Sequence, residues 1–424
     1  MLKNDGEKQL KQFHDEMFQK ETYKINDRIT YYCGYGHSNC VVIEGDKSTV
    51  LIDALDSNAR GERLKSVLSE NTDKPIKTII FTHSHPDHRG GSGAFKDSVE
   101  ETIMFASATP ALQGYNEIND VLMKRTARQF GRGLTNDECI CQGLGMREGV
   151  YVNDGSYDFM PITTLYTEDT TRTIDGIKME LVRVPGETDD QMLIWLPDDG
   201  VLCCGDNFYA CFPNLYALRG SQYRDIAQWI HSLEVLMSYP AEVLLPGHMK
   251  PIFTHKNIQE TLSQYKEALS YILHETLHCM NLGMSVSETV SHVTLPEHLS
   301  SLPYLQEFYG SLEWAVKGIY SGYVGWFDGN PVNLHPLSDQ EWASKLMNLI
   351  SEDTLRNEIP RAISQQEYQY ALQLCALFDN TKTIDDTIIS WEIDCLLALS
   401  KQETSACGRN YYIACANDLK NQSK

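Results

Sequence analysis

The sequence predicts an α/β domain followed by an all-helical domain, and three observations support this. Short β-branched runs alternate with helical patterns through about the first 255 residues. Several of those runs end in metal-ligand side chains. Beyond that point strand-like runs become scarce and apolar residues recur at helical spacing. We therefore place the two domains at residues 1–255 and 256–424.

The predicted strands are short aliphatic runs bounded by Gly, Asp or Pro turns. They cover residues 41–43, 49–52, 78–81, 178–184, 192–196, 200–204 and 243–245. Two helices are expected among them. The first covers residues 1–24 and lies on the surface, with Phe13, Met17 and Phe18 at helical spacing, and the second covers residues 59–71.

Two apolar repeats indicate amphipathic helices in the second domain. In both, apolar residues recur at steps of three and four. The repeats consist of Leu262, Tyr265, Leu269 and Ile272, and of Tyr370, Leu374, Leu377 and Phe378.

Composition narrows the classes of partner. The 424 residues carry 36 Lys+Arg against 58 Asp+Glu, a net charge of −22, so nucleic acid and anionic membranes would be repelled. There is no apolar run of the roughly 18 residues that a membrane helix needs. The N-terminus lacks the apolar segment of a secretory signal, which predicts a cytoplasmic protein whose 12 cysteines are thiols.

The clearest motif follows the strand predicted at residues 78–81. It reads Thr-His-Ser-His-Pro-Asp-His, so that His83, His85, Asp87 and His88 fall within six residues. Imidazole and carboxylate together suit zinc or a similar divalent ion. Their alternation can place His83 and His85 on one metal, and Asp87 and His88 on a second.

This loop resembles the H-x-H-x-D-H motif of the metallo-β-lactamase superfamily, which implies an αββα sandwich for the first domain. Three further ligand positions match the superfamily in order, each at the end of a predicted strand. They are Glu187 in a Pro-Gly-Glu-Thr segment where the superfamily usually has histidine, Asp206 after Cys-Gly, and His248 after Leu-Pro-Gly.

The carboxylate at Glu187 is similar to the alkylsulfatase branch of the superfamily. Other segments resemble that branch as well, from about residue 25 to the C-terminus. The clearest are Asn-Leu-Tyr-Ala-Leu-Arg-Gly at 214–220, Gly-Trp-Phe-Asp-Gly-Asn-Pro at 325–331 and Gly-Arg-Asn-Tyr-Tyr at 408–412. The resemblance implies that the helical domain is the alkylsulfatase dimerisation domain and that the protein is a homodimer.

The resemblance also implies roles for these residues. Two zinc ions per chain would share a hydroxide nucleophile, with manganese or iron as alternatives for nitrogen and oxygen ligands. One ion would be held by His83, His85 and Glu187, the other by Asp87, His88 and His248, with Asp206 bridging. Two dications would also hold an anionic ester despite the net charge of −22.

Asp87, Arg219 and Tyr209 are the candidate catalytic residues. The planar fork of Arg219 matches two oxygens of a sulfate, and the family's sulfate-binding arginine stands in this motif. The sequence departs from the family after Asp206, itself shorter than the family's glutamate. Alkylsulfatases have a T-H-T-L-H-N run there, whereas residues 209–214 hold no histidine. Tyr209 is the nearest substitute as proton donor.

Three functional hypotheses follow. The leading one is a dinuclear zinc hydrolase that cleaves an alkyl sulfate or related anionic ester. The second keeps the metal chemistry but changes the substrate to a lactone, thioester or phosphoester, because the family histidines are missing. The third is a metal-binding dimer without catalytic activity.

Overall fold

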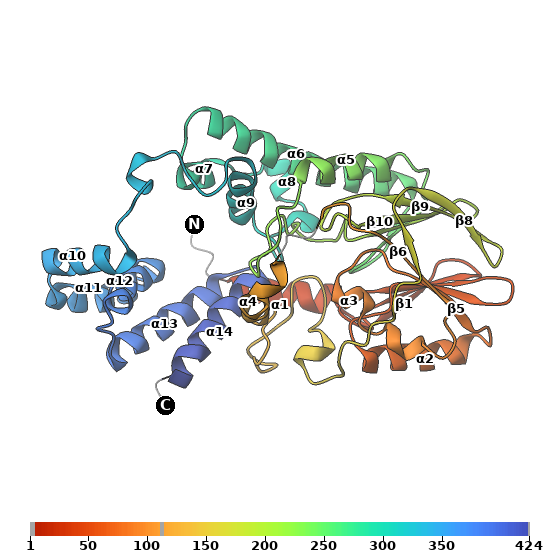
Figure 1. The fold of residues 1–424 in the computed structure, drawn as a ribbon, viewed down its shortest axis with the longest axis horizontal. Coiled ribbons are helices and arrows are strands. Elements are labelled where there is room, and N and C mark those ends of the chain that lie inside the picture. Colours follow the sequence, from red (N-terminus) through yellow and green to blue (C-terminus); the bar gives the residue numbers. More distant parts are fainter. Residues whose placement is uncertain (1–4, 111–113, 423–424) are drawn as a thin grey trace.

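The computed structural model describes residues 5–110 and 114–422. Two sheets pack face to face with helices on their outer faces, and a helical region follows (Figure 1). This arrangement confirms the predicted αββα sandwich and the helical C-terminal part. Among residues 5–110 and 114–422, no helix is both long and apolar enough to cross a bilayer.

The first sheet has seven strands in sequence order, β1 to β7. Strands β1 to β4 pair antiparallel, and β4 to β7 pair parallel. Helix α2 (Asn58–Asn71) covers the outer face, where Leu64 packs in one cluster with Leu51 and Ile79. The strands are β1 Glu21–Lys24, β2 Ile29–Cys33, β3 Cys40–Glu44, β4 Thr49–Ile52, β5 Ile76–Ile80, β6 Glu101–Phe105 and β7 Thr164–Tyr166.

The second sheet has six strands in the order β13-β12-β11-β10-β9-β8. Its pairs are antiparallel except β11 with β12. Helix α5 (Ile226–Met237) covers the outer face, with Trp229 packed in one cluster with Leu193 and Leu202. The strands are β8 Thr170–Ile174, β9 Ile177–Arg183, β10 Met192–Leu196, β11 Val201–Gly205, β12 Val243–Pro246 and β13 Ile252–Phe253.

The inner faces of the two sheets form the core between them. Ile29, Tyr31 and Ile43 from the first sheet pack in one cluster with Met192 and Ile194 from the second. All five side chains are fully buried. This apolar layer brings the loops at one edge of each sheet together, and the candidate site lies there.

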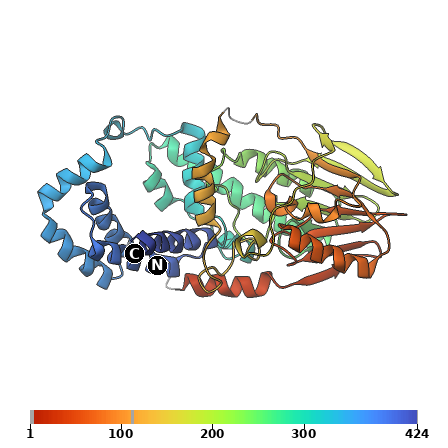
Figure 2. The ribbon, with the colours of Figure 1, turned by 60° about the horizontal axis from the view of Figure 1, so that its bottom comes forward.

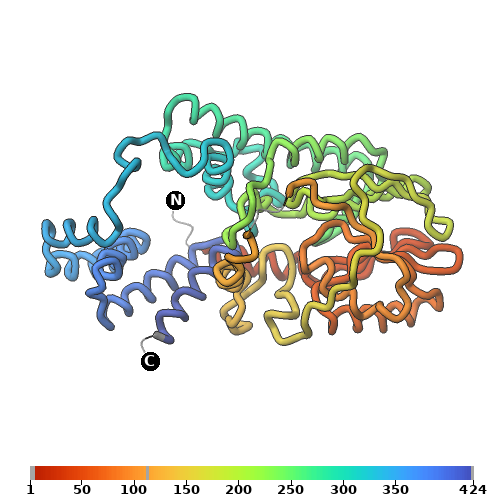
Figure 3. Tube along the Cα trace, viewed as in Figure 1, coloured from red at the N-terminus to blue at the C-terminus, as the bar shows by residue number. Residues whose placement is uncertain are grey.

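The helical part begins with α6, and both predicted apolar repeats fall in its helices, within α6 and α12. Residues 325–338 lead from α9 to α10 (Figure 3), and α11 and α12 pack in one cluster with α13, where Phe378 and Ile388 are buried together. The helices are α6 His255–Asn281, α7 Val286–His292, α8 Glu297–Ser300, α9 Leu312–Val324, α10 Asp339–Ile350, α11 Glu352–Ser364, α12 Tyr368–Thr381, α13 Asp386–Gln402 and α14 Ala406–Gln422.

Two further helices connect the sandwich to the helical part. Helix α4 (Asn119–Gln129), orange in Figure 2, packs against α14, and Arg128 pairs with Asp418 at 2.6 Å. Helix α1 (Gly6–Met17) packs against α13. Its side chains Leu10 and Phe13 are buried, and Phe13 stacks on Phe308 with ring centroids 4.2 Å apart.

The predicted N-terminal helix over residues 1–24 was therefore wrong in two respects. The helix ends at Met17, and residues 21–24 form strand β1 instead. One face of the helix is packed rather than exposed, because its apolar positions contact the helical part of the chain. Residues 1–4 lie outside the described part.

Candidate metal centre

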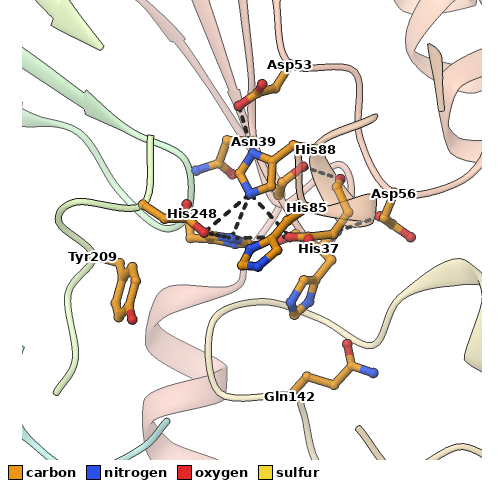
Figure 4. A network of polar contacts seen from close by, with 12 residues as sticks. His37, Asn39, Asp53, Asp56, His85, His88, Gln142, Tyr209 and His248 are labelled. Atoms are coloured by element: carbon orange, nitrogen blue, oxygen red, sulfur yellow. Dashed lines mark hydrogen bonds and ion pairs between the residues drawn. The ribbon is translucent and has the colours of Figure 1, made fainter. Parts of the chain in front are cut away.

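The site lies where strands from both sheets end. The loop after β5 carries His83 and His85, and the short helix α3 (Pro86–Arg89) that follows carries Asp87 and His88. Asp206 directly follows β11, and His248 follows β12 by one residue. Because both sheets direct these strand ends to one edge of the sandwich, side chains distant in the sequence converge there (Figure 4).

The ligand atoms lie close enough to surround metal ions. Asp206 Oδ2 is 3.5 Å from His83 Nε2 and from His88 Nε2, and 3.4 Å from His248 Nε2. Asp87 Oδ2 is 3.3 Å from His88 Nε2 and 3.4 Å from His248 Nε2. His85 and Glu187 join the same centre, since each offers a ligand atom within 4.8 Å of one on Asp206. All seven predicted metal ligands are therefore brought together.

Hydrogen bonds leave one nitrogen of each of two imidazole rings facing the other. His88 Nδ1 donates to Asp53 Oδ2 at 2.7 Å, and His248 Nδ1 donates to the carbonyl oxygen of His37 at 2.9 Å. The other nitrogens, His88 Nε2 and His248 Nε2, lie 3.2 Å apart. Beside the carboxylates of Asp87 and Asp206 this pair needs positive charge, as protons or as a metal ion.

Two further buried atoms indicate the same requirement. Among the described residues, His83 Nε2 and Asp206 Oδ1 have no hydrogen-bond partner. Buried polar atoms are nearly always paired, so these mark positions where another group belongs. A set of imidazole nitrogens and carboxylate oxygens is the ligand set of zinc, manganese and iron. The residues present therefore fit divalent metal ions.

The electrostatics of the bare site agree. Burial disfavours charge on His88 and His248, but Asp206 and Asp87 outweigh it and raise the pKa of His88 well above its ordinary value and that of His248 to about 10. Burial likewise opposes ionisation of Asp206, yet the surrounding histidines hold its pKa well below the usual range. The carboxylate of Asp206 therefore stays ionised, and the negative charge of the centre attracts cations.

Asp53 is a supporting residue that the sequence analysis did not assign. It follows β4 with φ of +58°, and its carboxylate accepts hydrogen bonds from Thr82 N and Thr82 Oγ1, both at 2.8 Å, as well as from His88. It therefore fixes both the loop and the His88 ring. Its position directly after the strand predicted at residues 49–52 is the feature by which the sequence could have identified this carboxylate as part of the site.

His37 was also missed, because it lies between β2 and β3 without a recognisable motif. Its backbone N–H donates to Asp56 Oδ1 and its Nδ1 donates to the carbonyl of Met146, both at 2.7 Å. His37 offers a ligand atom within 4.8 Å of ligand atoms of Asp87 and His248. Burial lowers the pKa of His37, which keeps the ring neutral.

Glu187 is held by two residues. Arg224 Nη1 lies 2.9 Å from Glu187 Oε1, and the Tyr209 hydroxyl donates to Glu187 Oε2 at 2.9 Å. The same hydroxyl accepts from the backbone N–H of Asn214 at 2.9 Å. Burial and the neighbouring Glu187 raise the pKa of Tyr209 well above 10. This geometry orients the Glu187 carboxylate and binds the Tyr209 proton tightly.

A cavity of about 480 Å³ opens beside His85 and Glu187. Arg219 lines it, with Nη2 3.5 Å from His85 Nε2. Within residues 5–110 and 114–422, no carboxylate forms an ion pair with Arg219. In a chain of net charge −22, such an arginine is available to bind an anion.

Helix α4 fixes the loop that carries Arg219. Arg125 donates from Nε and Nη2 to the carbonyl of Leu218, at 3.1 and 2.7 Å. Gln129 Oε1 accepts from the backbone N–H of Arg219 at 2.6 Å. The guanidinium is therefore directed to the cavity by contacts of its backbone, and among the described residues its side chain bonds only to His85 Nε2.

Two family models match the chain. The metallo-beta-lactamase superfamily model covers residues 33–248, about half of the chain, and the alkyl sulfatase dimerisation model covers residues 285–422. The chain therefore belongs to the metallo-beta-lactamase superfamily, and its C-terminal part carries the alkyl sulfatase dimerisation domain. Both matches confirm the resemblance found in the sequence.

Alkylsulfatases are among its relatives. A linear primary-alkylsulfatase of Pseudomonas sp. (strain ATCC 19151) is 31% identical over 344 residues, which cover 78% of this chain and 65% of the relative. Alkyl/aryl-sulfatase BDS1 of Saccharomyces cerevisiae (strain ATCC 204508 / S288c) is 27% identical over 414 residues, covering 94% of this chain and 64% of the relative. The chain thus spans less than two thirds of either relative.

A solved structure shows the same fold. The stereoselective inverting sec-alkylsulfatase Pisa1 from Pseudomonas sp. superposes with a TM-score of 0.86 at 24% identity, over 97% of this chain and 67% of that one. At this identity the likeness establishes the fold alone. It covers both the sandwich and the helical part.

Proposed function

We propose that the protein is a metal-dependent hydrolase of sulfate esters. The observation that carries the proposal is the cluster of seven metal-ligand side chains beside a cavity lined by Arg219, which forms no ion pair with a carboxylate of the described residues. The cluster accounts for hydrolysis, and the arginine accounts for an anionic substrate. The alkylsulfatase relatives support sulfate as that anion.

Seven residues would hold the metals. His83, His85 and Glu187 would hold one zinc ion, and Asp87, His88 and His248 the other, with Asp206 shared between them. Manganese and iron suit the same nitrogen and oxygen ligands. When bound, two such cations supply Lewis acidity and lower the pKa of a water molecule toward neutrality.

The chain's own residues then bind and orient the ester. Arg219 grips two sulfate oxygens and sets the direction of the ester bond. Asp53 and the His37 carbonyl hold the His88 and His248 rings by their Nδ1 atoms. Tyr209 and Arg224 hold Glu187. We assign Tyr209 this positioning role in place of the proton-donor role expected from the sequence.

The first experiment measures inorganic sulfate released from dodecyl, hexyl and 4-nitrophenyl sulfate by metal-loaded protein. We expect release that disappears in Asp87→Ala and persists in Asp198→Asn, a matched carboxylate on an exposed turn. A thermal melt of each variant checks folding. Full activity of Asp87→Ala would refute the mechanism. Turnover of a lactone or phosphoester without sulfate release would favour the alternative substrates instead.

Arg219 provides the test for the anion. Arg219→Ala removes hydrogen bonds to two sulfate oxygens, each worth about 1.5–3 kcal/mol, so kcat/KM should fall by about 100-fold or more. Arg219→Lys should recover only part of this loss, because a lysine lacks the planar fork. Unchanged kinetics in Arg219→Ala would remove the arginine from the binding site.

We further propose a homodimer formed through an apolar surface on residues 323–350. Large apolar side chains lie exposed there, including Trp326 at 81%, Val332 at 74% and Leu349 at 82%. So much exposed apolar surface within the dimerisation-domain match is typical of a protein contact. The double variant Trp326→Ser/Leu349→Ser should sediment as a monomer. Leu165→Ser, on β7 of the sandwich, is the control and should not change the sedimentation.

A further inference from the structure

His37 lies beside the metal centre, although it was not among the seven predicted ligands. A ligand atom of its ring lies within 4.8 Å of ligand atoms of Asp87 and His248. The ring is edge-on to that of His248, with centroids 5.2 Å apart (Figure 4). Ligand atoms of one ion, each about 2.0–2.2 Å from it, lie roughly 3–4 Å apart. The His37 ring is therefore close to the distance at which it would share an ion with Asp87 and His248.

One nitrogen of the His37 ring is available to a cation. Burial lowers the pKa of His37, so the ring carries a single proton. Nδ1 holds that proton, because it contacts the carbonyl oxygen of Met146 at 2.7 Å and a carbonyl can only accept. Nε2 then has a lone pair and no hydrogen-bond partner among the described residues. An unpartnered acceptor on a residue that is only 5% exposed marks a place where another group belongs.

The backbone around His37 is joined to both neighbouring ligand loops. The His37 carbonyl accepts from His248 Nδ1 at 2.9 Å, and Ser38 Oγ donates to the carbonyl of Asp87 at 2.7 Å. Asn39 N donates to the carbonyl of the residue before His248 at 2.8 Å. This segment between β2 and β3 therefore fixes the position of the His37 ring relative to Asp87 and His248.

Arg60 of α2 holds the backbone and the ring of His37 together. The His37 N–H donates to Asp56 Oδ1 at 2.7 Å, and Arg60 Nη1 donates to both oxygens of Asp56, at 3.0 and 3.1 Å. Arg60 Nη2 also donates to the carbonyl of Arg147 at 2.7 Å, next to the Met146 carbonyl that accepts from the ring. Such outer hydrogen bonds fix the tautomer and the orientation of a metal-binding histidine.

We infer that His37 is a further ligand of the ion proposed for Asp87, His88 and His248, and that it binds through Nε2. This inference rests on the metal placement of the proposed function. With the shared Asp206, five side chains would surround this ion. Because divalent ions at such sites take about four to six ligands, this position would leave little room for the ester.

The other metal position would then be the one that is open to the substrate. His85 and Glu187 line the cavity that contains Arg219. Among the described residues that line this cavity, neither His37 nor His248 is present. Catalytic metal sites keep a coordination position open for water or substrate. The ester would therefore approach the ion of His85 and Glu187, while His37 helps to hold the neighbouring ion.

His37→Asn tests the assignment, because an asparagine amide can keep the donor to the Met146 carbonyl but lacks Nε2. Competition with a chromophoric chelator measures the affinity for Zn²⁺ and Mn²⁺. Loss of a residue that merely supports a ligand costs about 10- to 100-fold in metal affinity, so loss of a ligand should weaken one of the two ions by at least about tenfold. His231→Asn, at an exposed histidine of α5, should bind both ions as the unaltered protein does.

Two further measurements separate a ligand from a residue that only supports the fold. The visible absorption of the Co²⁺-loaded protein reports the ligands of the ion, so it should differ between His37→Asn and the unaltered protein. The rise in Tm on metal loading should also be smaller in His37→Asn. Unchanged affinities and an unchanged Co²⁺ spectrum would overturn the inference while leaving the proposed function intact. Failure of the unaltered protein to bind any of these metals would overturn both.

Discussion

His88 Nε2 and His248 Nε2 lie 3.2 Å apart, and each ring donates its Nδ1 proton elsewhere. Asp53 receives the proton of one ring and the His37 carbonyl that of the other. The two Nε2 atoms and the carboxylates of Asp87 and Asp206 beside them need positive charge, which protons or metal ions can supply. This relationship depends on backbone positions in four different loops, and it makes the centre a place where metal binding should stabilise the fold.

Metal removal should therefore lower thermal stability. A ligand that binds only the folded state stabilises it by about 2.7 kcal/mol at one hundred times its dissociation constant. We expect Tm to fall by several degrees after chelation and to recover when zinc is restored at two ions per chain. His231→Ala, at an exposed histidine of α5, should show the same shift. A Tm that is insensitive to chelator would contradict metal binding at this centre.

Asp53→Asn should weaken metal binding without removing a ligand. The carboxylate fixes the His88 tautomer, and loss of such a partner typically costs 10- to 100-fold in metal affinity. Competition with a chromophoric chelator measures this affinity directly. Asp46→Asn, a carboxylate in the turn between β3 and β4, is the matched control. Equal metal affinities in the Asp53→Asn and Asp46→Asn variants would show that Asp53 contributes to the fold and not to metal binding.

Tyr209→Phe separates a positioning role from proton donation. The tyrosine hydroxyl donates to Glu187 and accepts from Asn214 N, so its loss should weaken metal binding and lower kcat. The shape of the pH–rate profile should remain. A proton donor would behave differently, since its removal would abolish one limb of the profile and slow esters with poor leaving groups more than 4-nitrophenyl sulfate.

Arg125→Met tests how α4 directs Arg219. Arg125 holds the Leu218 carbonyl with two hydrogen bonds, so its removal should loosen the loop and raise KM by roughly tenfold while kcat changes less. Metal content should stay the same, because no ligand is touched. Lys124→Met, one position earlier on the helix, is the control. A KM equal to that of the unaltered protein would show that the hydrogen bond to Gln129 alone is enough to hold the Arg219 loop.

The sequence predicted those parts of the fold in which local pattern and tertiary role agree. The strands that precede His83, Asp206 and His248 are mostly apolar, because most of their residues are buried on both faces of the sheets. Strand β8 has no buried residue and carries polar side chains, so hydrophobicity did not reveal it. Its pairing with β9 defines it instead.

The site residues could be predicted where several ligand-type residues fall close together in one motif. They could not be predicted where a backbone group makes the contact. The His248 ring is oriented by a carbonyl oxygen, which no residue type reveals. Tyr209 was expected to give up a proton, and only the structure places its hydroxyl on Glu187. The contacts of α4 with the Arg219 loop join segments 90 residues apart and follow from the fold alone.

Glu392 on α13 should make the helical part less stable as pH rises. Its side chain is buried with Oε2 unpartnered among the described residues, and burial followed by the nearby Asp379 raises its pKa to about 8. The folded state therefore binds a proton that the unfolded state releases near pH 4.5. The favourable contribution is complete below that pH and is lost as pH rises toward about 8.

Glu392→Gln removes this titration while keeping the shape of the side chain. We expect its Tm to exceed that of the unaltered protein at pH 8–9, with a difference that shrinks toward pH 5. Glu260→Gln, at an exposed position of α6, should follow the unaltered protein at every pH. Because the metal centre is identical in these proteins, its own pH dependence cancels in the comparison. A difference that stayed constant from pH 5 to pH 9 would assign the effect to packing rather than to the buried carboxyl.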